Sequence, residues 1–302
     1  KAKQYDKALE TGEKLVALDP GDVEAAHQNL KAAEGKKDPD LIRKWSDATS
    51  KAAVKMASAP QPKEAGEVET WKREVDYARQ VNIYTEYALY ATAVQTADPR
   101  KRIELVEALE QRNPKSEYLP KMYPLQFASY RQAGDTAKAF ALAEKLLGAG
   151  LQDEDMLAFV ADQYVQQKKD PEKVVEYANR LVEVVSTKPK PEGVSDEEWN
   201  KKKTMLAGLG NFMAGSTMVD PLKRYAPADK SLRAALPLVE SNDQLKAATL
   251  FYLGLANYSL KNLADALKFN QQCAAIKSPF QTKANENVRV LRTQVPATKK
   301  KK

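Results

Sequence analysis

Apolar residues recur at spacings of three and four along most of the chain, which is the period of an amphipathic α-helix. Runs that alternate apolar and polar residues, as half-buried strands do, are missing. Asp-Pro steps and Ser-x-x-Glu/Gln boxes mark helix starts, because Asp and Ser accept hydrogen bonds from free N–H groups and Pro has no N–H to lose. The steps are Asp38-Pro39, Asp98-Pro99, Asp170-Pro171 and Asp220-Pro221, and the boxes are Ser195 with Glu198 and Ser241 with Gln244. The pattern predicts an all-α protein with helices of roughly 12–18 residues.

A second pattern recurs on a longer period. A small residue is followed four positions later by another small or apolar residue and three further on by a third. The sets are Ala8, Gly12 and Leu15; Ala139, Ala143 and Leu146; Val174, Ala178 and Leu181; Ala228, Leu232 and Ala235; and Ala266, Asn270 and Cys273. Small residues at such spacing allow two helices to approach closely where they cross, while larger ones fill the groove to the next pair.

These residues resemble the tetratricopeptide repeat (TPR) family, whose unit of about 34 residues pairs a first helix, A, with a second helix, B. The resemblance covers most of residues 1–278. It implies a right-handed α-solenoid of about six TPR-like helix-turn-helix units with a C-terminal capping helix. Two units carry insertions, because two spacings are too long for one unit: Ile42 to Arg102 and Val174 to Ala228.

The insertions and turns suggest a division of the chain into segments. We expect N-terminal repeats, a linker, central repeats opened by one long helix at 68–97, a Pro-rich loop, C-terminal repeats, a capping helix and a disordered Lys tail. Their bounds are 1–57, 58–67, 68–185, 186–194, 195–278, 279–294 and 295–302. The chain opens on a helix B without its helix A, so we expect further residues upstream. The compartment therefore stays open: cytoplasmic and exported or periplasmic locations both fit.

Composition adds few constraints. Hydrophobic residues make up 43% and charged residues 29% of the 302 positions, as in chains that fold. The formal net charge is +7, but Lys299 to Lys302 contribute +4, which leaves 7 − 4 = +3 for the rest. No apolar run is long enough to span a membrane. The Lys tail leaves a contact with nucleic acid open as an alternative that we consider unlikely.

Candidate chemistry is sparse. The chain has one His, His27, and one Cys, Cys273, so it offers no disulfide framework of its own and almost no Cys/His zinc site. Nucleotide-loop, zinc-protease and nucleophile-elbow motifs are missing. We expect Cys273 to be a buried structural thiol and His27 to be an exposed helix residue rather than a groove contact. We expect Lys201, Lys202 and Lys203 to pair along their own helix with Glu197 and Glu198. The sequence thus predicts no enzyme and no cofactor.

Aromatic residues are the better lead. Tyr77, Tyr84, Tyr87 and Tyr90 run along the predicted long helix. The resemblance places a set of side chains at the helix A positions that line the concave groove in TPR proteins: Tyr84, Tyr87, Lys121, Arg131, Phe251 and Leu255. Tyr and Arg dominate the binding energy of many interfaces. The alternative is that the aromatic residues fill gaps between repeats.

We therefore expect a non-catalytic scaffold whose groove binds a peptide or helix of a protein partner. One alternative is a structural subunit of a larger complex or oligomer that contacts its partners through the long helix 68–97 and the insertions. The other is the nucleic-acid-associated protein that uses the Lys tail. The identity of the partner cannot be read from the sequence.

Overall fold

The structure, a computed structural model, describes residues 2–294. This part of the chain forms fourteen α-helices and one short 3-10 helix and contains no strand, so the predicted all-α class is confirmed. The helices fall into two compact units, residues 1–139 and 140–302. The predicted Lys tail at 295–302 lies outside the described residues.

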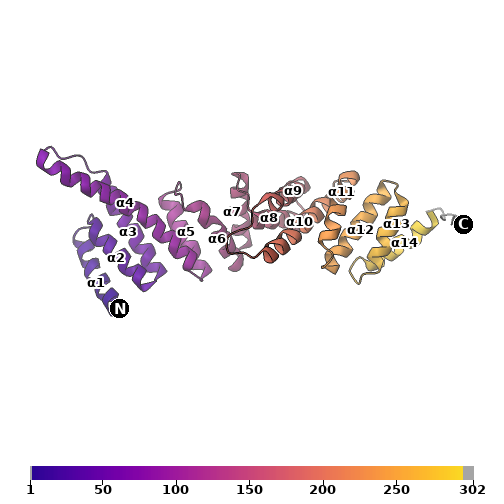
Figure 1. Ribbon diagram of the computed structural model, residues 1–302, viewed down its shortest axis with the longest axis horizontal. Coiled ribbons are helices and arrows are strands. Elements are labelled where there is room, and N and C mark those ends of the chain that lie inside the picture. Colours follow the sequence, from indigo (N-terminus) through magenta and orange to yellow (C-terminus); the bar gives the residue numbers. More distant parts are fainter. Residues whose placement is uncertain (1, 295–302) are drawn as a thin grey trace. The chain divides into compact units, whose positions relative to one another are not determined.

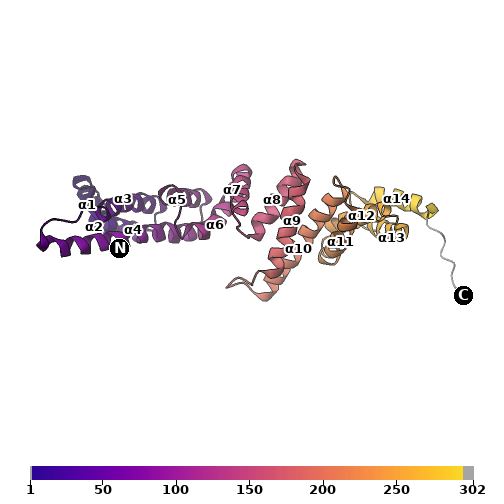
Figure 2. The same ribbon diagram turned by 90° about the horizontal axis from the view of Figure 1, so that it is seen from above.

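The first unit contains helices that pack each on the next along the chain. They are α1 (Ala2–Leu18), α2 (Val23–Lys36), α3 (Pro39–Ala57), α4 (Ala65–Gln95), α5 (Pro99–Arg112) and α6 (Leu119–Gln132). In addition α2 contacts α4, α4 contacts α6, and α3 contacts α5. These helices therefore form two layers, α1/α3/α5 and α2/α4/α6 (Figure 2). The next helix, α7 (Thr136–Gly148), crosses the boundary between the units.

The core of the first unit lies between its two layers. Around α2 and α3 it is built of Leu30, Ile42 and Trp45, each at most 3% exposed. Around α4, α5 and α6 it continues with large apolar side chains: Leu89, Leu105, Leu109, Leu119 and Met122. The apolar stripes that the helical period predicts are thus buried between neighbouring helices.

The long helix of the sequence analysis is α4, which has 31 residues. Its N-terminal part extends beyond its neighbours α2 and α3 (Figure 1). The indole N–H of Trp71 donates a hydrogen bond of 3.2 Å to the carbonyl oxygen of Ala59, which ties this part to the preceding linker.

The second unit continues with helices that again pack each on the next. They are α8 (Glu154–Gln167), α9 (Pro171–Thr187), α10 (Asp196–Val219), α11 (Tyr225–Ala235), the 3-10 helix η1 (Leu236–Leu238), α12 (Asp243–Ser259), α13 (Leu263–Ala274) and α14 (Gln281–Gln294). Here α10 contacts both α8 and α12. The helices α8, α10 and α12, which alternate along the chain, therefore lie next to one another.

Four of the six predicted helix-start signals stand at the start of a helix: Asp38, Asp98, Asp170 and Ser195. Asp38 and Asp98 cap α3 and α5, and the box of Ser195 with Glu198 caps α10. At Asp220 the prediction is wrong, because this residue ends α10 and the next helix begins at Tyr225. The predicted box at Ser241 is also wrong, because the neighbouring residue Asn242 accepts the N–H of Leu245 and is the cap of α12.

The predicted pairing of Lys202 within its own helix is wrong as well. Its ammonium lies 3.0 Å from Glu154 and 2.9 Å from Asp155 at the start of α8. Glu154 is buried and also forms an ion pair with Lys188 beyond the end of α9. The second lysine compensates the burial, so the pKa of Glu154 lies below its usual value even though desolvation opposes ionisation. The cluster links α8, α9 and α10.

Small residues mark the helix crossings. Fully buried alanines occur in helices of both units, and they include Ala26, Ala53, Ala78, Ala178, Ala214, Ala228 and Ala266. Gly215 of α10 marks a close crossing in the second unit, because a Cβ atom built there would lie 2.5 Å from Cγ of Leu232 in α11. Separations this short permit only a hydrogen atom at the glycine.

We predict that Gly215→Ala lowers the free energy of unfolding by about 1–3 kcal/mol, because α11 must move or Leu232 must leave its rotamer. Urea unfolding followed by circular dichroism measures the change. The matched control is Gly66→Ala at the exposed start of α4, where no atom lies within 4 Å of the new Cβ. The control should stay within about 1 kcal/mol of the wild type. Equal stability of both variants would contradict the tight crossing.

Candidate protein-binding surface

A continuous series of rings crosses the α2/α4/α6 layer of the first unit. It is contributed by α2, by α4 and by the residue before α6, and its members are His27, Tyr77, Tyr84, Tyr87, Tyr90 and Tyr118. We call this set the aromatic row. Four of its members come from one helix at spacings of seven, three and three, so the helical period alone aligns them on neighbouring faces of α4.

The rings contact one another in sequence. The centroid of the His27 ring lies 6.2 Å from that of the Tyr77 ring and 5.5 Å from that of the Tyr84 ring. Tyr87 lies 6.0 Å from Tyr84, 6.5 Å from Tyr90 and 6.1 Å from Tyr118, and Tyr90 stacks on Tyr118 at 5.4 Å. Separations of 4.5–7 Å are typical of favourable aromatic pairs. The row is therefore a connected surface.

The end of the row beside α2 is anchored by carboxylates. The hydroxyl of Tyr84 donates to Glu34 at 2.6 Å, and that of Tyr77 donates to Glu24. The pKa of each phenol is raised, first by burial and then by the carboxylate that accepts its proton. The ammonium of Lys31 lies 3.7 Å from the centre of the Tyr84 ring, a cation–π contact. This end is held in place by α2.

His27 belongs to the anchored end, so the expectation of an exposed helix residue is wrong. It is half-buried, and its Nδ1 lies 3.0 Å from the hydroxyl oxygen of Tyr77. Because that hydroxyl donates to Glu24, Nδ1–H must be the donor to Tyr77 and the proton is absent from Nε2. Nε2 is buried and has no hydrogen-bond partner among the described residues. Burial and the nearby charge of Lys31 lower the pKa of His27.

The other end of the row differs in its polar groups. Within residues 2–294, the hydroxyls of Tyr87, Tyr90 and Tyr118 have no hydrogen-bond partner. The exposed ammonium of Lys121 lies 6.0 Å from the Tyr90 ring and 5.7 Å from the Tyr118 ring. No carboxylate of the described chain lies within ion-pair distance of Lys121. This end presents polar groups that are available to a ligand.

The predicted groove residues are thus partly brought together. Tyr84 and Tyr87 lie in the row and Lys121 adjoins it. Arg131 lies near the opposite end of α6, with its guanidinium 5.8 Å from the Phe127 ring. Phe251 and Leu255 belong to α12 of the second unit. There the half-buried Phe251 packs in a separate aromatic cluster with Phe212, Tyr252 and Phe280.

Two residues that the sequence analysis did not single out extend the surface along α4. Ile83 is 56% exposed and Val94 is 50% exposed, and Tyr87, which lies between them, is 46% exposed. With Tyr90 they stand at spacings of four, three and four, which keeps them on one face of the helix. We call Ile83, Tyr87, Tyr90 and Val94 the α4 stripe. Their helical spacing was visible in the sequence, but their exposure depends on where the neighbouring helices lie.

Beside the stripe is a pocket of about 770 Å³ between α2, α4 and α5. Tyr87, Ala91 and Thr92 form its α4 wall. Lys101 also lines it, and the ammonium of this residue forms an ion pair with Asp40 at 2.7 Å. Lys37 lines the pocket as well, so the lining carries a second cation besides the paired Lys101.

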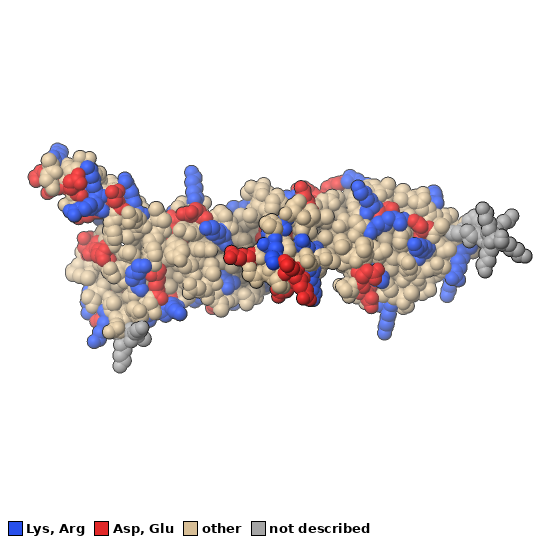
Figure 3. All heavy atoms as spheres, viewed as in Figure 1, with Lys and Arg blue, Asp and Glu red and all other residues tan. Residues whose placement is uncertain are grey.

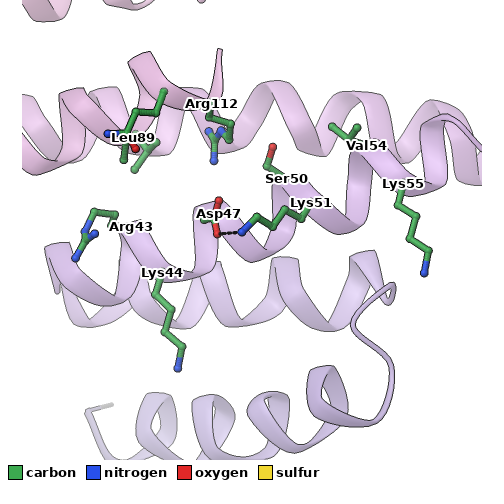
Figure 4. A pocket seen from close by; sticks show the side chains of 11 residues that line it. Arg43, Lys44, Asp47, Ser50, Lys51, Val54, Lys55, Leu89 and Arg112 are labelled. Carbon is green, nitrogen blue, oxygen red and sulfur yellow. Dashed lines mark ion pairs between the residues drawn. The ribbon is translucent and has the colours of Figure 1, made fainter. Parts of the chain in front are cut away.

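A second pocket of about 780 Å³ lies in the other layer, between α3 and α5 (Figure 4). It is lined by several cations, but they do not converge. Lys51 turns toward Asp47 at 2.7 Å, whereas Lys44 and Lys55 point away from Arg112. Arg112 donates to the carbonyl oxygen of Ser46 at 2.8 Å and so joins α5 to α3. We interpret this region as a structural contact between two helices.

Metal-binding groups do not gather in the described part of the chain. No cluster of three or more His, Cys, Asp or Glu side chains there could hold a metal ion. Cys273 is fully buried, its thiol donates to the carbonyl oxygen of Ala247 at 3.3 Å, and burial raises its pKa to about 11. This confirms the structural thiol. None of the helices between residues 2 and 294 has the length and apolarity needed to cross a bilayer.

Comparison with known proteins adds no identity to this geometry. No family model matches the chain, and no curated protein matches it. The surface must therefore be interpreted from its own residues.

The environment of His27 predicts a pH dependence of stability. Its pKa is about 6.5 in the unfolded chain and lower in the folded one, so the unfolded chain binds the proton first as the pH falls. The free energy of unfolding is then fully retained above about pH 6.5 and declines as the pH falls from that value toward the folded pKa. His27→Gln should remove this part of the decline, as measured by urea unfolding at pH 8, 6.5 and 5.

The chain has a single histidine, so its imidazole signals in a proton NMR titration give the folded pKa directly. A pKa at or above 6.5 would contradict the arrangement in which Nε2 is buried without a partner.

Proposed function

We propose that this protein is a non-catalytic protein-interaction scaffold of the TPR type, a right-handed α-solenoid of about six helix pairs. The packing supports the proposal in both units. Consecutive helices pack on one another from α1 to α6 and from α8 to α14, several helices at alternate positions are in contact, and glycines such as Gly215 stand where two helices lie close together. These are the features expected when helix pairs stack as repeats.

The observation that carries the function is the aromatic row. Large aromatic side chains that only fill gaps are covered by their neighbours, but Tyr87 remains 46% exposed and is connected through ring contacts to five other rings. Tyrosine provides a large apolar area, a hydroxyl and few rotatable bonds, which makes it a frequent anchor of protein interfaces. The row lies on α2, α4 and α6, the helices that correspond to helix A in the TPR resemblance.

The chemistry of the row favours a peptide or helix as the ligand. The surface is broad and mostly apolar, its anchored end is fixed by Glu24 and Glu34, and its other end offers three hydroxyls and one ammonium. Such a surface can bury apolar side chains and satisfy a few polar groups of a partner. The ionisable groups at its anchored end, His27, Glu24 and Glu34, are hydrogen-bonded to Tyr77 and Tyr84 and hold these rings in place.

A second candidate function is that of a structural subunit that contacts a larger assembly through α4. The N-terminal part of α4 that extends beyond α2 and α3 favours it (Figure 1). Positive and negative side chains lie close together on this part (Figure 3), where Lys72 pairs with Glu69 and Arg79 with Asp76. Mixed charges of this kind are common at the rim of interfaces.

We predict that Tyr87→Ala weakens binding of the protein partner to the first unit. Affinity should fall at least about tenfold, because a central aromatic anchor of an interface is lost. The wild type and the variants are immobilised, and proteins captured from an extract of the source organism are quantified by mass spectrometry. The matched control is Tyr258→Ala, which alters a tyrosine of the second unit that is 43% exposed.

The proposal fails if Tyr87→Ala and a second variant, Tyr84→Ala/Tyr87→Ala, capture the same proteins in the same amounts as the wild type. Charge reversal at Lys72 and Arg79 tests the second candidate. Loss of capture in that variant, with full capture by Tyr87→Ala, would favour the structural subunit. A contribution of the Lys tail is tested by deleting residues 299–302 and measuring the salt dependence of binding to a DNA or RNA duplex.

A further inference from the structure

The exposed face of α4 changes from polar to apolar along the helix. Over its N-terminal half the outward positions are Lys72, Asp76, Arg79 and Gln80, all polar and exposed. Over its C-terminal half the same face is formed by the α4 stripe, whose four members are all apolar or aromatic. A helix that met only water would have no reason to change in this way, because exposed apolar residues gain nothing from solvent.

The stripe has the dimensions of a helix-packing surface. From Ile83 to Val94 it advances eleven residues, or about 16 Å at a rise of about 1.5 Å per residue. Its spacings of four, three and four are those of the ridge that one helix presents to another. About three turns of a second helix would cover it. An extended peptide repeats its side chains every two residues and would match this spacing poorly.

The charge beside the stripe defines one further feature of the occupant. The ammonium of Lys121 lies against the Tyr90 and Tyr118 rings and, in the described part of the chain, has no carboxylate partner. Burial and the charges of Glu117 and Glu86 raise the pKa of Tyr118, and Glu86 is buried and accepts a hydrogen bond from Asn113 at 2.8 Å. An acidic side chain of a partner would therefore complete this end.

We propose that the α4 stripe docks an amphipathic helix of a partner protein, and that an acidic residue of this helix pairs with Lys121. The proposal rests on the proposed function and makes it more specific. The partner helix places apolar residues at i, i+3 or i+4, and i+7 against Ile83, Tyr87, Tyr90 and Val94. Its carboxylate reaches Lys121 and accepts a hydrogen bond from the Tyr118 hydroxyl.

The test uses selected peptides as probes. A library of random 16-residue peptides displayed on phage is selected on the full chain, and the best binders are synthesised with a fluorescent label. Anisotropy gives their affinities, and circular dichroism of the mixture reports whether a peptide becomes helical on binding. We expect helical peptides with the stated apolar spacing and one conserved acidic position.

Variants outside the aromatic row separate this proposal from the general one. Ile83→Ser/Val94→Ser should weaken binding of the selected peptides at least about tenfold. Lys121→Met should weaken peptide binding about fivefold and reduce the dependence of the affinity on salt. Lys121→Arg should retain the affinity and its salt dependence. The matched control is Val290→Ser on α14 of the second unit, where Val290 is 54% exposed; it should change nothing. Circular dichroism confirms that each variant stays folded.

Each other outcome has a distinct meaning. Peptides that depend on Tyr84 and Tyr87 but bind without helix formation, or bind equally to Ile83→Ser/Val94→Ser, overturn this inference and leave the proposed function intact. Binders that carry a basic residue opposite Lys121 overturn it too. If binding of the selected peptides depends neither on Tyr84 and Tyr87 nor on Ile83 and Val94, both proposals are contradicted. A wild-type dimer that Ile83→Ser/Val94→Ser converts to a monomer, as light scattering would show, assigns the stripe to a second copy of the chain instead.

Discussion

Close approach between neighbouring helices is the constraint on which this structure depends. Two helices approach most closely where one of them carries little more than a hydrogen atom or a methyl group at the crossing. Gly215 against Leu232 and the fully buried alanines meet this requirement. When two helices are packed at such a crossing, the large apolar residues that flank it face the next helix. Each helix therefore packs against its neighbours along the chain. The layers of the first unit follow from this repeated rule.

The same rule decides which side chains are left over. In the first unit α4 packs on α3 and α5 and contacts α2 and α6, so most of its circumference is buried in its C-terminal half. The one face that no neighbour covers carries the α4 stripe. Within the described chain, other helices expose at most two large apolar side chains each, such as Leu15 and Leu18 of α1 or Val54 of α3, whereas α4 exposes three on one face: Ile83, Tyr87 and Val94. The fold therefore does not require apolar residues on this face, and we explain them by binding of a partner.

Much of the fold could be predicted from the sequence because its signals are local. Helical period, Asp-Pro steps and the absence of Gly and Pro beyond Gly66 defined most helices and the long α4. The signals failed at two positions. At α12 the adjacent residue Asn242 is the cap in place of Ser241. At α10 the Asp-Pro step follows the last turn, so Asp220 ends this helix and does not start another. The position of His27 could not be predicted, because its burial depends on Tyr77 and Tyr84, fifty and more residues away. The exposure of Ile83 and Val94 has the same origin.

The two ends of the aromatic row have complementary roles in binding. At the α2 end, Glu24 and Glu34 hold two phenols in fixed orientations, so a partner does not have to immobilise them. At the Tyr118 end the three hydroxyls and the Lys121 ammonium have no hydrogen-bond or ion-pair partner within the described chain, so a ligand displaces only water from them. The cluster around Phe251 in the second unit lacks this division, because three of its four rings are phenylalanines without a polar group. A fixed apolar surface that ends in unsatisfied polar groups is what selective binding requires, and only the first of these two aromatic sets has it.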